Sequence, residues 1–187
     1  MLKKIPEFLR FCFNARRGFF LVEAMVALSI LMVGFLGIVA LLSSSLGLNR
    51  RIANTYTANY LAMEGIEVVK NLIDANHIQG YSWNCGFPAG GDFEVSYYDT
   101  ATVPCPGAAL RPVGSASSYL LFDSSNNTYN DPKSPGATGV PTFFKRVITI
   151  GTSGSASTTV ASKVTWLAQG GRTESVEIDD VFWNWRQ

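Results

Sequence analysis

The hydrophobic pattern of the chain changes along its length, from one continuous apolar run to short alternating segments. Residues 19–42 read FFLVEAMVALSILMVGFLGIVALL, with Glu23 as the only charge. At about 1.5 Å per residue, a helix of this length exceeds the roughly 30 Å hydrocarbon core of a bilayer. The run therefore predicts a transmembrane helix over residues 19–44.

A second helical pattern follows the apolar run. Residues 45–75 carry apolar side chains at the spacing of an amphipathic helix. No proline and no cluster of loop residues separates the two patterns, so one long helix over residues 19–75 is preferred to two helices joined by a loop. Gly47 and Asn49 mark the expected position of a bend. The amphipathic positions are Ile52, Tyr56, Met63, Ile66, Val69 and Ile73.

The remaining residues predict a loop-rich region followed by an antiparallel sheet. Residues 76–141 are rich in Gly, Pro, Ser and Asn, and only 93–98 and 119–122 resemble short strands. Residues 142–187 alternate between apolar and polar positions, as in an antiparallel meander. The amphipathic helix is the natural cover for the apolar face of this meander. An α+β fold is therefore predicted, with the long helix packed on the C-terminal antiparallel sheet.

The predicted meander contains a turn signal and ends in aromatic residues. Gln169-Gly170-Gly171 predicts a hairpin turn. The terminal segment VFWNWRQ, which contains Trp183 and Trp185, is interpreted as a strand or cap packed on the core rather than as an exposed binding patch. The apolar positions expected to face the core are Phe144, Ile148, Ile150, Val160, Val164, Trp166, Val176 and Ile178.

Charge is distributed unevenly along the chain. The net charge is +1, which gives no indication of nucleic-acid binding. Positive charge is concentrated in residues 1–18, which we interpret as a basic leader peptide. The positive-inside rule then predicts a cytoplasmic N-terminus and a C-terminal domain outside. The leader carries Lys3, Lys4, Arg10, Arg16 and Arg17 against the single acid Glu7.

Two general interpretations explain only part of this N-terminal pattern. A secretory signal peptide normally has an apolar region of about 7–15 residues, and the serines at 43–45 form a poor cleavage site. A plain single-pass anchor explains the length but not Glu23, because a carboxylate inside a membrane helix is costly and usually marks a function. The alternative for Glu23 is a side chain that reaches to the membrane surface.

The string RRGFFLVEAMVALSIL, residues 16–31, resembles the processing site of type IV prepilins. In that family, a membrane aspartic peptidase cuts after a glycine that follows basic residues, and then N-methylates the new first residue, commonly phenylalanine. The resemblance assigns these two positions to Gly18 and Phe19. The family's glutamate is the fifth residue after the cut, where this chain has Glu23. Segments FFKRVITI, KVTWLA and FWNWR also resemble the sheet of minor pilins.

The resemblance implies a ladle-like pilin fold and a structural role in a type IV pilus. Its expected partners are the prepilin peptidase/methyltransferase, other pilin subunits and the inner membrane. Residues 19–44 would be stored in that membrane and later form the filament core, where Glu23 neutralises the Phe19 amine of a neighbouring subunit. Charges that are costly alone become tolerable when paired. Two alternatives stay open: a pseudopilin of a type II secretion or DNA-uptake system, in a periplasmic pseudopilus, and a membrane-anchored binding protein that never assembles.

Cysteine placement is compatible with one disulfide. Cys85 and Cys105 lie beyond the apolar run, in a compartment where a disulfide can persist, whereas Cys12 lies in the leader. Closing a loop of about 20 residues would stabilise the domain by roughly 3 kcal/mol. The alternative is two unpaired thiols in a flexible loop.

The sequence offers little catalytic chemistry. His77 is the only histidine, so no paired-histidine metal site can form, and no phosphate-binding glycine loop is present. We expect no cofactor and no enzymatic activity. One polar cluster has oxygen ligands of the kind that Ca²⁺ prefers, but its spacing is not that of an EF-hand, and a plain turn is the preferred interpretation. The cluster consists of Asp123, Asn126, Asn127 and Asp131.

Overall fold

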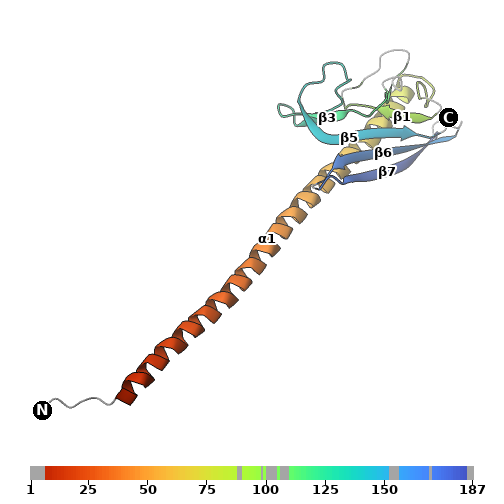
Figure 1. Cartoon of the computed structure of the whole chain (residues 1–187). Helices are drawn as coiled ribbons and strands as arrows, with labels where there is room; N and C mark the ends of the chain where they lie inside the picture. Colours follow the sequence, from red (N-terminus) through yellow and green to blue (C-terminus); the bar gives the residue numbers. More distant parts are fainter. Residues whose placement is uncertain are drawn as a thin grey trace. The chain divides into compact units, whose positions relative to one another are not determined.

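The computed structural model describes residues 7–87, 90–97, 99, 105, 110–151, 156–168 and 170–184. The chain forms two compact units, Met1–Arg50 and Arg51–Gln187. One helix, α1 (Glu7–Ile78), runs through both units, and a seven-stranded sheet follows it in the second unit (Figure 1). The fold is therefore α+β, with a helix packed on an antiparallel sheet, as the sequence predicted.

Helix α1 continues without interruption through Gly47 and Asn49, so the alternative of two helices joined by a loop is wrong. It is also longer than residues 19–75, because it begins at Glu7 and ends at Ile78. Hydroxyl groups within the helix do not disturb it. The Ser29 hydroxyl donates to the Met25 carbonyl oxygen at 2.8 Å, so this polar group is satisfied by the preceding turn.

All strand pairs are antiparallel, and β5 lies at the centre of the sheet. It pairs with β6 along one side and with β1 and β3 along the other, while β7 extends the sheet beyond β6. The predicted meander is therefore present as β5–β6–β7, and shorter strands from the preceding region widen it. The strands are β1 (Gly91–Glu94), β2 (Arg111–Pro112), β3 (Tyr119–Asp123), β4 (Thr128–Asn130), β5 (Val140–Ile150), β6 (Ser157–Leu167) and β7 (Thr173–Trp183).

Two details differ from the expected strands. The segment expected at 93–98 forms β1, which begins two residues earlier and ends at Glu94, and residue 98 lies outside the described residues. The expected hairpin turn joins β6 to β7, where Gly170 and Gly171 have φ of 90° and 77°. Glycine suits this left-handed region because it has no Cβ to clash with the backbone. Residue 169 lies outside the described residues.

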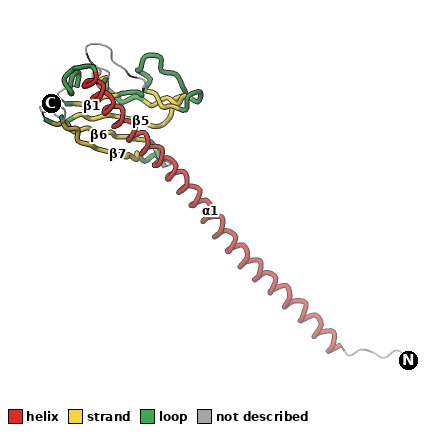
Figure 2. Tube along the Cα trace, turned by 180° about the vertical axis from the view of Figure 1, so that it is seen from behind, coloured by secondary structure: helices red, strands yellow, loops and turns green. Residues whose placement is uncertain are grey.

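Alternation along β5 and β6 buries one face of the sheet, as expected. Figure 2 shows α1 running along one face of these strands. The side chains of Phe144 and Trp166 are opposite one another in the β5–β6 register, with ring centroids 6.0 Å apart. On β7 the expected positions Val176 and Ile178 are only partly buried, because β7 is an edge strand. The buried members of the predicted set are Phe144, Ile148, Ile150, Val160, Val164 and Trp166.

The predicted apolar face of the amphipathic helix is partly wrong. Val69 and Ile73 are buried, but Ile52, Tyr56 and Met63 are 51%, 63% and 56% exposed. The face that contacts the sheet instead contains small residues in its first half. Small side chains let the helix approach the sheet closely, which a count of apolar residues does not reveal. The buried residues of this face are Ala58, Leu61, Ala62, Gly65, Val68, Val69, Leu72, Ile73 and Asn76.

Gly65 marks the closest approach of α1 to the sheet. A Cβ at this position would lie 2.4 Å from Ser162 Oγ and 2.7 Å from Ile148 Cδ1. Directly beside it lies Arg146, a charged residue on the inner face of β5 that is almost fully buried. Its guanidinium donates to the Leu61 carbonyl oxygen at 3.1 Å and to the Val95 carbonyl oxygen at 2.9 Å. These bonds tie the helix, the sheet and the segment after β1 together.

The C-terminal aromatic prediction is only partly correct. Phe182 on β7 packs against the core, but Trp183 is 63% exposed. The reason is strand alternation at the sheet edge, because neighbouring residues of a strand point to opposite faces and α1 covers only one of them. Trp185 lies outside the described residues.

Candidate functional site

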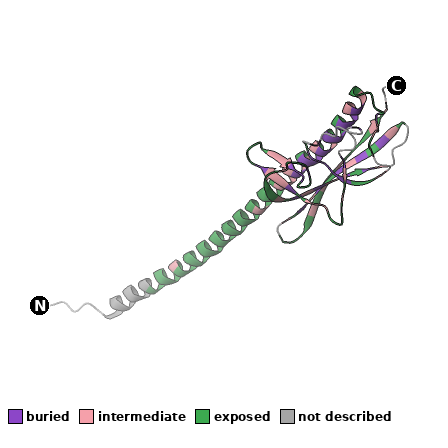
Figure 3. Ribbon diagram, turned by 90° about the horizontal axis from the view of Figure 1, so that it is seen from above, coloured by how far each residue is buried: buried purple, intermediate pink, exposed green. Residues whose placement is uncertain are grey.

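Among the described residues, most of the exposed large apolar side chains belong to the first unit of the chain. Between Gly18 and Leu48, every side chain is exposed except Ala24 and Gly47, which are intermediate (Figure 3). Phe19 is 76% exposed and Leu41 is 74% exposed. The mean hydropathy of the most apolar window is 2.7, and none of that window is buried. By length and composition, this helix can form a single membrane span.

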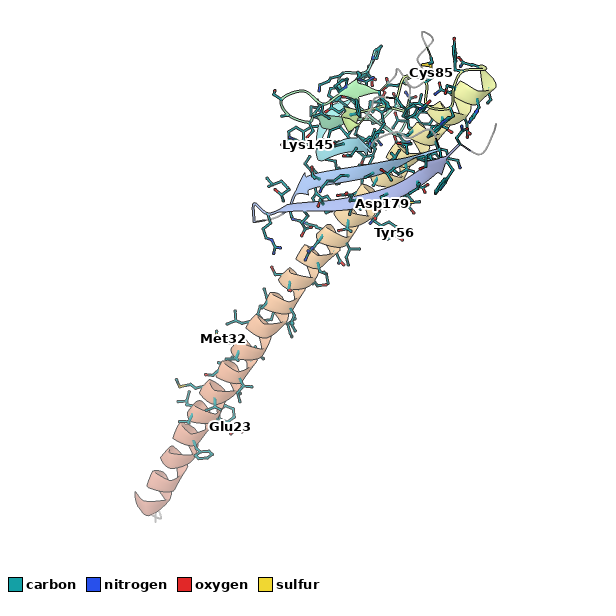
Figure 4. All side chains as sticks on the ribbon, turned by 90° about the vertical axis from the view of Figure 1, so that its right-hand side faces the viewer. Glu23, Met32, Tyr56, Cys85, Lys145 and Asp179 are labelled. Carbon is teal, nitrogen blue, oxygen red and sulfur yellow. A yellow bond between two sulfur atoms is a disulfide. The ribbon has the colours of Figure 1, made fainter. Side chains whose placement is uncertain are left out.

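Glu23 lies within this apolar surface (Figure 4). It shares one helix face with Phe19, Val22, Val26 and other apolar residues. Across the residues that the structure describes, no cationic group pairs with the Glu23 carboxylate. A carboxylate among apolar side chains is costly in a membrane unless a partner neutralises it. The described residues therefore provide no positive group to neutralise the Glu23 carboxylate.

The predicted processing residues lie on the same helix. Gly18 and Phe19 are consecutive residues of α1, and a Cβ built at Gly18 meets no described atom within 4 Å beyond its chain neighbours and the adjacent helix backbone. No other described part of the first unit therefore packs against the helix at the peptide bond between Gly18 and Phe19. Side chains of residues 7–17, which include the basic dipeptide at 16 and 17, lie outside the described set.

A second apolar patch lies on the part of α1 that packs on the sheet, but on the face turned away from it. Its four residues are Ile52, Tyr56, Tyr60 and Met63, which we call the outer stripe. Their exposures range from 51% to 63%. Positions separated by three and four residues share one helix face. The rings of Tyr56 and Tyr60 are 5.7 Å apart. The second unit therefore also presents an apolar helix face without a described partner in its own fold.

The disulfide that the sequence analysis expected is present. Cys85 and Cys105 are bonded, with their Cα atoms 5.9 Å apart. The end of α1 holds this region in place, because the buried Asn76 amide donates to the carbonyl oxygens of Trp83 and Cys85 at 3.0 Å each. The bond closes a loop that includes β1, so it fixes the segment after α1 to the segment between β1 and β2.

The two carboxylates of the polar cluster considered for Ca²⁺ have different partners within the chain. Asp123 accepts hydrogen bonds from the Ser125 amide at 2.9 Å and from the Thr138 hydroxyl at 2.8 Å. Hydrogen bonds from Ser125 and Thr138 lower the pKa of the Asp123 carboxyl below its ordinary value. Asp131 instead pairs with Arg111 at 2.7 Å. The carboxylates thus accept bonds from their own chain, which favours the interpretation of a plain turn.

A buried ionic network was not predicted from the sequence. The Arg111 guanidinium lies 2.6 Å from Asp99 and 2.7 Å from Asp131, and it donates to the Ser134 hydroxyl at 2.9 Å. Burial acts to lower the pKa of Arg111, but hydrogen bonds to Asp99 and Asp131 outweigh it and raise that pKa. Its members come from distant loops of residues 76–141, so only the folded chain brings them together. The network is a structural clamp on those loops.

No protein-family model, curated protein or solved structure matches this chain. The class of protein is therefore defined by the fold alone: one long apolar N-terminal helix followed by an antiparallel sheet. This order of elements is consistent with a pilin-like architecture.

Proposed function

We propose that the chain is a structural subunit of a type IV pilus or related filament. A prepilin peptidase/methyltransferase cuts it after Gly18, and its hydrophobic N-terminal helix then drives assembly. The observation that carries the proposal is the exposed apolar helix with the single carboxylate of Glu23 and no described partner for it. The motif of basic dipeptide, glycine, phenylalanine and glutamate at residues 16–23 supports it.

Charge pairing explains why assembly would need both the cut and Glu23. Cleavage creates an α-amine at Phe19, with a pKa of about 7.7–8.0 in unperturbed peptides, so it is largely protonated at neutral pH. In a bundle of apolar helices, the amine of one subunit and the carboxylate of another neutralise each other. A subunit in the wrong register would leave both charges unpaired in apolar surroundings, which costs several kcal/mol per ion. The pair therefore selects one register.

Localisation follows from the same helix. Before assembly, the segment after Phe19 spans the inner membrane once, with the N-terminus in the cytoplasm and the sheet domain outside. During assembly, the same apolar surface loses its contacts with lipid and packs against the helices of neighbouring subunits. The outer stripe of Ile52, Tyr56, Tyr60 and Met63 extends apolar contact to the second unit. The role is structural, and no catalytic residue is assigned.

The first prediction concerns the mature N-terminus and the role of Glu23. Mass spectrometry of the protein from a host with a prepilin peptidase should find Phe19 as a methylated first residue. Glu23→Val should be cut normally but should fail to enter filaments, because the Phe19 amine loses its counter-charge. Val26→Ala, on the same helix face, is the matched control and should assemble.

Three outcomes contradict this proposal in different ways. A native chain that begins at Met1 would favour an anchored binding protein that never assembles. Normal filaments from Glu23→Val would remove the charge-pairing mechanism. Loss of secretion or DNA uptake on deletion, with surface filaments intact, would assign the chain to the pseudopilins instead.

A further inference from the structure

A small cavity opens between α1 and the hairpin of β3 and β4. Its volume is about 240 Å³, and it is separate from both exposed apolar surfaces of the helix. A cavity needs only about 10–15 Å³ of such volume to hold one water, so this one has room for a small organic group. Its walls come from α1, from the segment after β1 and from the hairpin. The lining residues are Glu64, Tyr97, Asn127, Thr128 and Tyr129.

Two polar groups of this cavity, the Glu64 carboxylate and the Thr128 hydroxyl, can accept hydrogen bonds from a ligand. Glu64 Oε1 pairs with Arg146 Nη1 at 3.2 Å, and the side chain of Glu64 is 30% exposed. Within the described residues, the structure gives Glu64 Oε2 no hydrogen-bond or ion-pair partner. The Thr128 hydroxyl is buried and also has no hydrogen-bond partner there. Buried polar groups are normally paired, so the Thr128 hydroxyl suggests that a ligand supplies its partner, and Glu64 Oε2 offers a second acceptor in the cavity wall.

Charge and aromatic character both favour a positive ligand. Tyr97 and Tyr129 line the cavity, and the faces of tyrosine rings attract cations. Burial and, secondly, the negative charge of Glu64 raise the pKa of the Tyr129 hydroxyl. The charge of Glu64 therefore reaches the cavity wall even though Arg146 pairs with one of its oxygens.

We propose that this cavity binds a primary ammonium group, held by the Glu64 carboxylate and the Thr128 hydroxyl between the two tyrosines. An ammonium has three N–H donors and no acceptor, which matches atoms that accept hydrogen bonds. An anion would be repelled by Glu64, and a purely apolar ligand would leave the Thr128 hydroxyl unpaired. The ammonium can come from a lysine side chain of a partner protein or from a free diamine. The site does not depend on the proposed filament function.

We expect weak binding, because one carboxylate oxygen already serves Arg146 and the site is partly open to water. Partly exposed ion pairs and cation–π contacts each contribute about 0.2–1 kcal/mol. An isolated ammonium should therefore bind only at roughly tens to hundreds of millimolar. A lysine presented by a bound partner would have a high effective concentration, so a weak site could still matter.

The test uses the full chain in detergent micelles with ¹³C-labelled threonine methyl groups. Titration with n-butylammonium chloride at constant ionic strength should shift the Thr128 methyl resonance saturably. n-Butanol, which has the same alkyl chain without the charge, should cause no saturable shift. Glu64→Gln should weaken n-butylammonium binding about fivefold, as expected for loss of one partly exposed charge contact. Glu67→Gln removes an exposed carboxylate from the same helix and should leave binding unchanged.

A second variant keeps the proposal testable if Glu64→Gln disturbs the buried Arg146. Tyr97→Leu removes an exposed ring of the cavity and leaves the Glu64–Arg146 pair in place. It should weaken n-butylammonium binding about threefold, as expected for one cation–π contact. Nα-acetyl-lysine methylamide represents a protein lysine, and 1,4-diaminobutane represents a free diamine. Tighter binding of either compound identifies the source of the ammonium and supports the site. Equal saturation by n-butanol, or unchanged n-butylammonium affinity in both variants, would overturn it.

Discussion

The two parts of α1 have the same backbone conformation but differ in whether their apolar side chains are buried. In residues 51–78, one face of the helix is buried against the sheet, and small residues such as Ala62 and Gly65 form the contact. In residues 18–48, no apolar side chain is buried. The first arrangement stabilises the domain from within. The second leaves its apolar surface uncovered by the described chain, although water solvates such a surface poorly.

The largest test of this comparison truncates one isoleucine in each part. Ile148 on β5 is fully buried beneath α1, and Ile30 is 68% exposed. Ile148→Ala should destabilise the domain by about 2–5 kcal/mol, because it loses buried contacts and leaves a cavity. Ile30→Ala should leave thermal unfolding of the domain in detergent micelles unchanged. Similar melting temperatures for the two variants would contradict the division of α1 into a core part and an external part.

A smaller effect is expected from adding one methyl group at two glycines of the same helix. Gly65→Ala should cost about 1–3 kcal/mol, because the new Cβ meets Ser162 and Ile148 and forces the helix away from the sheet. Gly47→Ala meets no atom within 4 Å. It should be neutral or slightly stabilising, because alanine has the higher helix propensity. Denaturant unfolding measures the free energy of unfolding of both variants. Equal stability would show that α1 does not pack against the sheet at Gly65 as closely as the distances to Ser162 and Ile148 indicate.

The smallest effect concerns the pH dependence of the turn after β3. The pKa of Asp123 is lower in the folded chain than its ordinary value of 3.8. Its contribution to stability is therefore present above about pH 4 and is lost as the pH falls through the folded pKa. The melting temperature of the native protein should exceed that of Asp123→Asn near pH 6, and the gap should narrow toward pH 2.

Asp179→Asn is the matched control for this titration. Asp179 is an exposed carboxylate on β7 (Figure 4), so the substitution makes the same change of charge without loss of the Ser125 and Thr138 hydrogen bonds. A gap of the same size and pH profile for both variants would show that net charge, and not the local bonds of Asp123, causes the effect.

Most elements of the fold could be predicted because their signals are local. The long helix, the β5–β7 meander and the Gly170-Gly171 turn each follow from periodicity or backbone preference within a few residues. The pairing of Cys85 with Cys105 followed from compartment and count. The candidate processing residues Gly18 and Phe19 and the candidate assembly residue Glu23 were found through a motif, and their roles stay predictions.

Features that depend on close approach could not be predicted in the same way. Counting apolar residues selected Ile52, Tyr56 and Met63 as core positions, whereas the contact face uses alanines and Gly65. The inner face of β5 contains the charged Arg146, which alternation places beside Phe144 and Ile148 but which its polarity alone would assign to solvent. Its burial is possible only because Leu61, Val95 and Glu64 offer acceptors from other elements.

The amino-acid sequence by itself determined where the helix and the main strands form, and that the N-terminal surface is apolar with one acid. Those properties depend on backbone preference and on the polarity of neighbouring residues. Only the tertiary structure decided which helix face is buried, that Arg111 joins Asp99 and Asp131, and that Glu64 lines a cavity with Tyr97 and Tyr129. These depend on distances between residues far apart in the chain, which the packing of α1 on the sheet establishes.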